Sequence, residues 1–138
     1  MSMQIFTDSS ANLFEEQVKE LKLEIDSLTL SINEDEVLCY EPGAPFDFDG
    51  FYARMRQDDK LQLRTSMINT DAFLKAFEPF LQAGTDILYL AMSAGLSGTW
   101  SGGQTAAEIL QKKYPQRTIR VVDTISATIG QGMMVREA

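Results

Sequence analysis

The residues best suited to ligand chemistry lie in Ser93 to Thr99, a loop of serines and glycines that should open directly into a helix. Serine hydroxyls donate hydrogen bonds, and glycines let backbone N–H groups turn toward a ligand. The start of a helix adds about half a positive charge. Together these groups can hold an anion, so we expect an anion site at this loop with Ser97 as one donor.

Two further loops have the same character. Thr7 to Ser10 should follow the first strand, and Asp123-Thr124 should follow the last one. Ligands of open α/β sheets bind where the strands end and the helices begin, so the three loops are expected at one edge of the sheet. Hydroxyls and carboxylates also cap helices and turns. Each loop taken alone can therefore be either a ligand site or a simple cap.

Named catalytic motifs do not fit these residues. Gly95-Leu96-Ser97 begins like a nucleophile elbow, but Thr99 replaces its second glycine and the sequence contains no histidine to act as a base. The next stretch, Gly98-Thr99-Trp100-Ser101-Gly102, lacks the lysine of a phosphate-binding P-loop and the glycine spacing of a dinucleotide site. No metal-ligand spacing is found either. We expect no catalytic residues, no cofactor and no metal.

The carboxylates Asp8 and Asp123 leave an alternative open. Acids on neighbouring strand ends more often cap loops, but they can also act as a pair. The competing hypothesis is therefore an enzyme acting on a phosphorylated small molecule, with the Ser97 loop as anion site and Asp8 as acid or base. A third hypothesis is a structural fragment with an exposed apolar face that a missing domain would cover.

The elements that must position these loops follow from hydrophobic periodicity. Short apolar runs predict strands at residues 4–6, 87–92 and 118–122, and apolar stripes at helical spacing predict helices within residues 14–21, 48–55, 73–80, 106–114 and 129–138. Alternation in residues 28–32, followed by residues 37–40, predicts a β-hairpin. The result is an α/β fold with a mainly parallel sheet, flanking helices and a hairpin.

Several local expectations complete this prediction. Asn12 and Asp47 should begin helices, Pro79 should break one, and residues 61–69 should form a connection without regular structure. Aromatic residues at helical spacing are usually core, although they could also line an acyl tunnel; they are Phe48, Phe51, Tyr52, Phe73 and Phe77. Cys39 is expected to be a small buried apolar residue.

The amino-acid composition makes some classes of binding partner and some cellular locations unexpected. The net charge of −8 repels phosphate backbones and anionic membrane surfaces, so nucleic acid is an unexpected partner. Cys39 is the only cysteine, which excludes an internal disulfide, and no leader or long apolar span suggests export or membrane insertion. We expect a cytoplasmic protein without membrane insertion. Because residues 129–138 have helical composition up to the last residue, we also expect one domain of a longer protein.

Four ordered motifs together resemble the DegV family, whose first domain would cover nearly the whole chain, residues 1–138. They are Thr7-Asp8-Ser9-Ser10, Thr65-Ser66, Leu96-Ser97-Gly98-Thr99, and Val122-Asp123-Thr124 with Gly130-Gln131-Gly132. The resemblance implies a carrier of a long-chain fatty acid rather than a catalyst. It also implies a fatty acid kinase as partner in some members, and a second domain that this chain lacks.

Carried over residue by residue, the resemblance puts the family's carboxylate-binding threonine on Thr65 and its binding serine on Ser97. Their neighbours Ser66 and Gly98 would assist. The sequence departs from the family where Met67-Ile68 replaces the usual Gln-Pro, and where Trp100 and Thr124 replace tyrosine and serine. None of these departures removes a proposed hydrogen-bond donor.

Overall fold

A parallel sheet forms the centre of the computed structural model, which describes residues 2–138. Its order is β2-β1-β6-β7, built from β1 (Met3–Asp8), β2 (Glu24–Asp26), β6 (Asp86–Ala91) and β7 (Ile119–Asp123). The central strands β1 and β6 pair from Met3 opposite Asp86 to Thr7 opposite Leu90. Because all four strands run the same way, their carboxyl ends share one edge.

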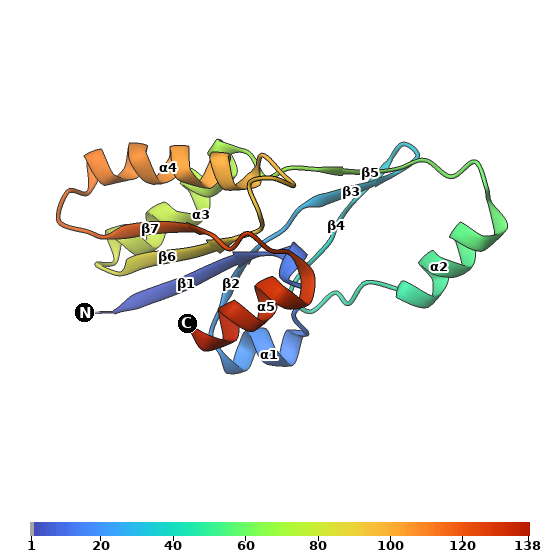
Figure 1. The fold of residues 1–138 in the computed structure, drawn as a ribbon, viewed down its shortest axis with the longest axis horizontal. Helices are drawn as coiled ribbons and strands as arrows, with labels where there is room; N and C mark the ends of the chain where they lie inside the picture. The colour runs from blue at the N-terminus through green and yellow to red at the C-terminus, as the bar shows by residue number, and fades with distance from the viewer. Residues whose placement is uncertain (1) are drawn as a thin grey trace.

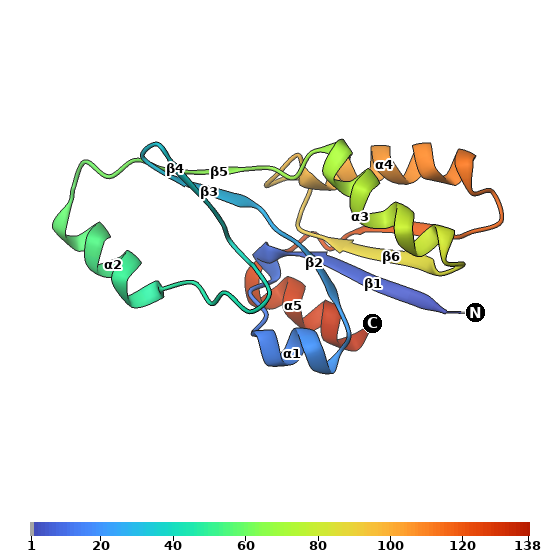
Figure 2. The same cartoon turned by 180° about the vertical axis from the view of Figure 1, so that it is seen from behind.

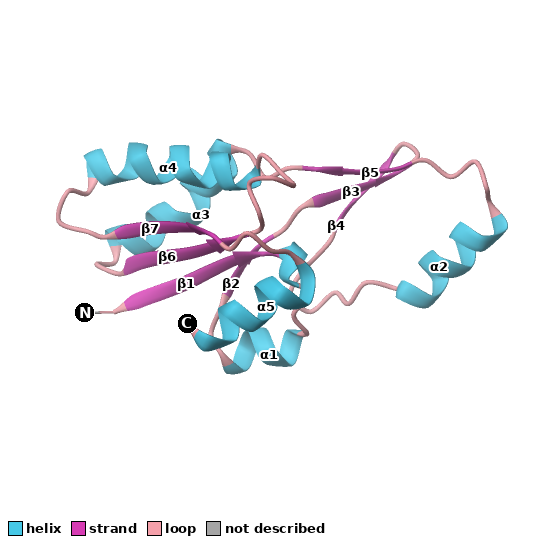
Figure 3. Ribbon diagram, in the orientation of Figure 1, coloured by secondary structure: helices cyan, strands magenta, loops and turns pink. Residues whose placement is uncertain are grey.

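Helices cover both faces of this sheet (Figures 1 and 3). On one face lie α3 (Thr70–Gln82) and α4 (Thr99–Lys113), and on the other lie α1 (Glu15–Glu20) and α5 (Thr128–Glu137). Each face has its own apolar cluster: Phe73 and Phe77 are fully buried under α3, whereas Val18 and Val135 join α1 to α5. None of the helices in residues 2–138 combines the length and apolarity that a membrane span requires.

A second, antiparallel sheet projects from this body as an arm (Figures 1 and 2). Its order is β4-β3-β5, formed by β3 (Thr29–Ile32), β4 (Asp35–Leu38) and β5 (Leu63–Ser66). Helix α2 (Phe48–Gln57) lies at the far end of the arm, away from the parallel sheet (Figure 2). The predicted α/β fold with a mainly parallel sheet, flanking helices and a hairpin at β3–β4 is confirmed.

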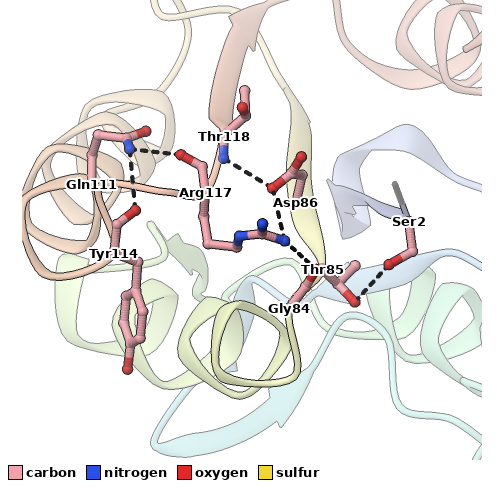
Figure 4. A network of polar contacts seen from close by, with 8 residues as sticks. All are labelled: Ser2, Gly84, Thr85, Asp86, Gln111, Tyr114, Arg117 and Thr118. Atoms are coloured by element: carbon pink, nitrogen blue, oxygen red, sulfur yellow. Dashed lines mark hydrogen bonds and ion pairs between the residues drawn. The ribbon is translucent and has the colours of Figure 1, made fainter.

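The opposite edge of the parallel sheet is closed by a polar network (Figure 4). The carboxylate of Asp86 accepts a hydrogen bond from the Thr118 backbone N–H at 3.0 Å and lies 3.6 Å from the Arg117 guanidinium. Arg117 also donates to the Gly84 carbonyl, and the Gln111 amide donates to the Arg117 carbonyl at 2.7 Å. These contacts join the starts of β6 and β7 to the end of α4, so this edge has a structural role.

Three predictions about single elements are wrong. Residues 61–69 contain β5, which forms because Leu63 to Ser66 pair with β3 rather than because of an apolar period. Thr7 and Asp8 belong to β1 instead of a loop, and both are fully buried. The break expected at Pro79 does not occur, since α3 continues to Gln82. The missing N–H of Pro79 costs one bond in the last turns, which burial of Phe77 and Leu81 offsets.

Some of the predicted helix starts and core residues agree with the structure, and others do not. Asp47 begins α2 as predicted, accepting from the Gly50 N–H, but Asn12 adopts φ 52° after a short 3-10 turn and α1 begins three residues later. Of the aromatic residues predicted as core, Phe73 and Phe77 are buried, whereas Phe48 and Tyr52 of α2 are 59% and 48% exposed and Phe51 is half-buried. Cys39 is half-buried rather than buried.

Candidate functional site

The loops after β6 and β7 lie against each other at the carboxyl edge of the parallel sheet. The Ser93 N–H donates to the Ser126 carbonyl at 2.8 Å, and the Ala94 N–H donates to the Asp123 carboxylate at 3.3 Å. Thr124 donates through its backbone N–H to the Ala91 carbonyl at 3.1 Å. Two of the three loops expected to share an edge are therefore in direct contact.

Ser97 lies where this loop enters α4. Its Oγ accepts a hydrogen bond from the Thr99 N–H at 3.2 Å and lies 2.9 Å from Thr99 Oγ1. Ser97 thus satisfies one of the N–H groups left open at the start of the helix, while Gly98 at the cap position has no side chain to do so. Ser97 is half-buried, so part of the residue remains in contact with solvent.

The end of β5 comes to the same place from a distant part of the chain. The Ile68 N–H donates to Thr99 Oγ1 at 3.3 Å, and a Cβ added to Gly102 would lie 2.8 Å from the Ile68 carbonyl oxygen. The Met67 side chain rests on Gly98. Through these contacts the fold brings the segment that contains Thr65 and Ser66 to the start of α4.

Thr65 and Ser66 are both exposed in β5 and, as neighbours in a strand, point to opposite faces of the sheet. Their backbones pair with Leu30 and Thr29 of β3, which fixes the strand while leaving the side chains in solvent. Within residues 2–138 neither hydroxyl forms a hydrogen bond to another side chain or to the backbone, and no hydrogen bond joins Thr65 to Ser97. Both hydroxyls are available to an external acceptor.

The glycines of the loop have a different role from the one expected. Gly98 has φ −69° and ψ −4°, which every residue type adopts, so it is not needed to turn the backbone. A Cβ at Gly98 would instead lie 2.6 Å from the Met67 sulfur, and a Cβ at Gly103 would lie 2.7 Å from the Tyr89 ring. Gly102, one turn into α4, is packed as closely, because an added Cβ there would meet the Ile68 backbone.

Asp8, the acid or base of the competing hypothesis, is engaged in hydrogen bonds inside the fold. Its carboxylate is buried and accepts from the Ser10 N–H at 3.1 Å, the Tyr89 hydroxyl at 3.0 Å and the Met92 N–H at 2.9 Å, and it also contacts the Ser10 hydroxyl. Burial, and then the charge of Asp8, raise the pKa of Tyr89 above its ordinary value. With its oxygens occupied, Asp8 holds β1, β6 and the first turn together.

Gln131, from the last of the four motifs, is buried with a structural role. Its amide nitrogen donates to Thr7 Oγ1 at 3.0 Å, and its amide oxygen lies 2.7 Å from the Ser10 hydroxyl. Gly132 lets α5 approach the chain at Ala11, where an added Cβ would lie 2.8 Å from the carbonyl oxygen. Sequence reasoning missed this network because its contacts join residues more than a hundred positions apart.

Asp26, at the end of β2, is a second residue that the sequence did not single out. It pairs in register with Asp8, and its Oδ2 is buried without a hydrogen-bond partner in the described part of the chain. Burial raises its pKa to about 7, with further contributions from the charges of Asp8 and Glu24. Nothing in the residue types around Asp26 signalled this burial.

Two segments thus form the candidate site, with hydroxyl and backbone N–H groups as its donors: Thr65 and Ser66 from β5, and Ser97 and Gly98 from the loop before α4. Such donors suit the oxygens of a carboxylate or phosphate. In residues 2–138 no group of three or more histidine, cysteine, aspartate or glutamate side chains is arranged to hold a metal ion.

The sequence of this chain is similar to that of a known protein family and of several curated proteins. A domain described as an uncharacterised protein of the DegV family matches residues 2–138. A DegV domain-containing protein of Clostridium perfringens is 37% identical over 131 residues, which cover 95% of this chain and 44% of that protein. The chain thus spans about half the length of the curated relatives it matches.

Solved structures share the fold. A stearic acid-binding protein from Eubacterium ventriosum superimposes with a TM-score of 0.86 at 24% identity, covering 98% of this chain and 45% of that one. A fatty acid-binding DegV family protein from Thermus thermophilus gives 0.80 at 25% identity, over 99% and 46%. The fatty acid kinase (Fak) B3 protein of Streptococcus pneumoniae, loaded with linoleic acid, gives 0.78 at 20% identity, over 99% and 47%. The chain belongs to the DegV family.

Proposed function

We propose that this chain binds a long-chain fatty acid through its carboxylate, with Thr65 and Ser97 as the main donors and Ser66 and Gly98 assisting. The observation that carries the proposal is the contact between Ile68 and Thr99, which brings the two donor segments together at the start of α4. A carboxylate accepts strong hydrogen bonds from hydroxyl and backbone N–H groups. The fatty acids bound by the structural relatives support the same ligand class.

The proposed role is that of a carrier in the cytoplasm, which presents its fatty acid to a fatty acid kinase and catalyses no reaction itself. The likeness to the pneumococcal Fak B3 protein supports the kinase as partner. Because the relatives are about twice as long, we propose that this chain is the first domain of a longer protein whose second domain completes the site. Binding is therefore best measured on the full-length protein.

The experiment is a titration with oleic acid by calorimetry, preceded by native mass spectrometry of the purified protein. A co-purifying long-chain acid and saturable binding of oleate are expected. Ser97→Ala should weaken binding by about 1 to 3 kcal/mol, or roughly fivefold to 150-fold, because a charge-assisted hydrogen bond is lost. It should also cost about 1 kcal/mol of stability, since Ser97 caps the Thr99 N–H.

Ser101→Ala is the matched control, because Ser101 is an exposed serine one turn further along α4. Its affinity for oleate should equal that of the unaltered protein. A phosphorylated small molecule as the only co-purifying ligand, without oleate binding, would contradict the carrier function and favour an enzyme. Equal oleate affinity in Ser97→Ala and Ser101→Ala would remove Ser97 from the site.

A further inference from the structure

Met67 is a large apolar side chain placed among polar donors. It directly follows Thr65 and Ser66 in the sequence, and its sulfur lies against Gly98, the neighbour of Ser97. The side chain is nevertheless 57% exposed. The exposed part of this apolar side chain remains in contact with water, which is unfavourable, and it adds little packing to the core.

Gly98 lacks a side chain at the point where Met67 rests on the loop before α4. Its φ of −69° would suit alanine or any other residue, so backbone conformation does not explain the glycine. An added Cβ, however, would lie 2.6 Å from Met67 Sδ and 3.8 Å from Met67 Cε. The missing side chain at position 98 therefore leaves room for the Met67 thioether in its present position against Gly98.

A fatty acid presents a polar carboxylate followed at once by apolar carbons. An apolar surface next to Thr65 and Ser97 would remove the first of these carbons from water and so favour binding. Methionine suits this task, because its unbranched and polarisable side chain adapts to a flexible chain. Met67 is the exposed apolar side chain that lies directly between the two donor segments.

We infer that Met67 is a further ligand contact, which packs on the acyl carbons next to the carboxylate, and that Gly98 seats it there. The inference rests on the proposed function and deepens it: the same site recognises a carboxylate that continues as an alkyl chain, and discriminates against phosphate and other wholly polar anions. Met67 thus adds a specificity-determining contact to the donors Thr65 and Ser97.

The test uses the full-length protein with ¹³C-methyl-labelled methionine, observed by NMR during titration with oleate. The Met67 signal is assigned from its loss in Met67→Leu. We expect the Met67 methyl to shift in proportion to the fraction of bound oleate. A stearic acid spin-labelled near its carboxylate should broaden this signal strongly, and one labelled near its methyl end should broaden it less.

Met133 of α5 is the control, because it is similarly exposed at 63% but belongs to a helix on the other face of the sheet (Figure 1). Its methyl should respond less to the carboxyl-end label than that of Met67. In affinity measurements Met67→Gln, which keeps the length and adds a polar amide, should bind oleate about fivefold to tenfold more weakly. Met67→Leu should stay within about twofold.

The possible failures are distinguishable. Oleate binding that depends on Ser97 while the Met67 methyl stays unshifted would overturn this inference and leave the proposed function standing. Stronger broadening of Met67 by the methyl-end label would overturn it as well, since the chain would then lie in the opposite direction. An absence of oleate binding in the unaltered protein would overturn both.

Discussion

Thr65 and Ser97, the two proposed donors, have different local environments. The Ser97 hydroxyl already caps the start of α4 by accepting from the Thr99 N–H, so its removal changes both the helix and the ligand site. Thr65 is exposed on a paired strand and supports no other group in the described residues. A change at Thr65 therefore reports on ligand binding with less interference from folding.

Thr65→Val keeps the shape of the side chain and removes its donor. We expect the affinity for oleate to fall by about 1 to 3 kcal/mol, with the thermal midpoint unchanged, because valine suits an exposed strand as well as threonine does. Calorimetry and thermal unfolding of the full-length protein measure the two quantities. Thr105→Val, at an exposed threonine of α4, should leave the affinity unchanged, and equal affinities in both variants would exclude Thr65 as a donor.

At the scale of elements, the site depends on how closely α4 approaches the end of β5. Gly102 lies at this approach, with the Ile68 carbonyl oxygen 2.8 Å from the position of an added Cβ and the Thr70 nitrogen 3.5 Å from it. These neighbours are backbone atoms, which cannot move aside as the Met67 side chain can. The glycine therefore sets the distance between the two donor segments.

Gly102→Ala should separate α4 from β5. We expect the free energy of unfolding to fall by about 1 to 2 kcal/mol, because overpacking outweighs the gain in helix propensity, and oleate affinity should fall too. Urea unfolding and calorimetry measure these effects. Gly95→Ala is the stability control, since an added Cβ there would make only an ordinary contact at 3.5 Å. A Gly102→Ala protein as stable as Gly95→Ala would show that the approach is not tight.

For the molecule as a whole, Asp26 makes stability depend on pH near neutrality. Its pKa is raised to about 7 in the fold by burial and by the charges of Asp8 and Glu24, against an ordinary value of 3.8. Between these values the folded chain holds a proton that the unfolded chain has released. The resulting stabilisation is complete below about pH 4 and is lost as the pH rises through about 7.

We therefore expect the contribution of Asp26 to the free energy of unfolding to decline between pH 4 and pH 8, by up to about 4 kcal/mol. Asp26→Asn should flatten this decline and be the more stable protein at pH 8, as measured by urea unfolding across the range. Glu24→Gln, which removes a charge from the same strand, should keep most of the decline. An identical pH profile in Asp26→Asn would show that Asp26 is ionised throughout the range.

The sequence by itself determined the elements whose patterns are local. The apolar run from Ile87 and the alternation from Leu28 predicted β6 and β3, and the stripe through Phe73 and Phe77 predicted α3, because side-chain periodicity records which face is buried. The ordered motifs likewise gave the family and the candidate donors. These inferences needed only neighbouring residues or the order of motifs along the chain.

Tertiary structure alone decided what depends on distant contacts. β5 is a strand because β3 pairs with it, and Asp8 can be buried because Tyr89 of β6 and Met92 directly after β6 supply its donors. Phe48 is exposed because no described element packs over α2, although its spacing resembles that of a core helix. Met67 meets Gly98 for the same reason: a contact between segments thirty residues apart leaves no period in either of them.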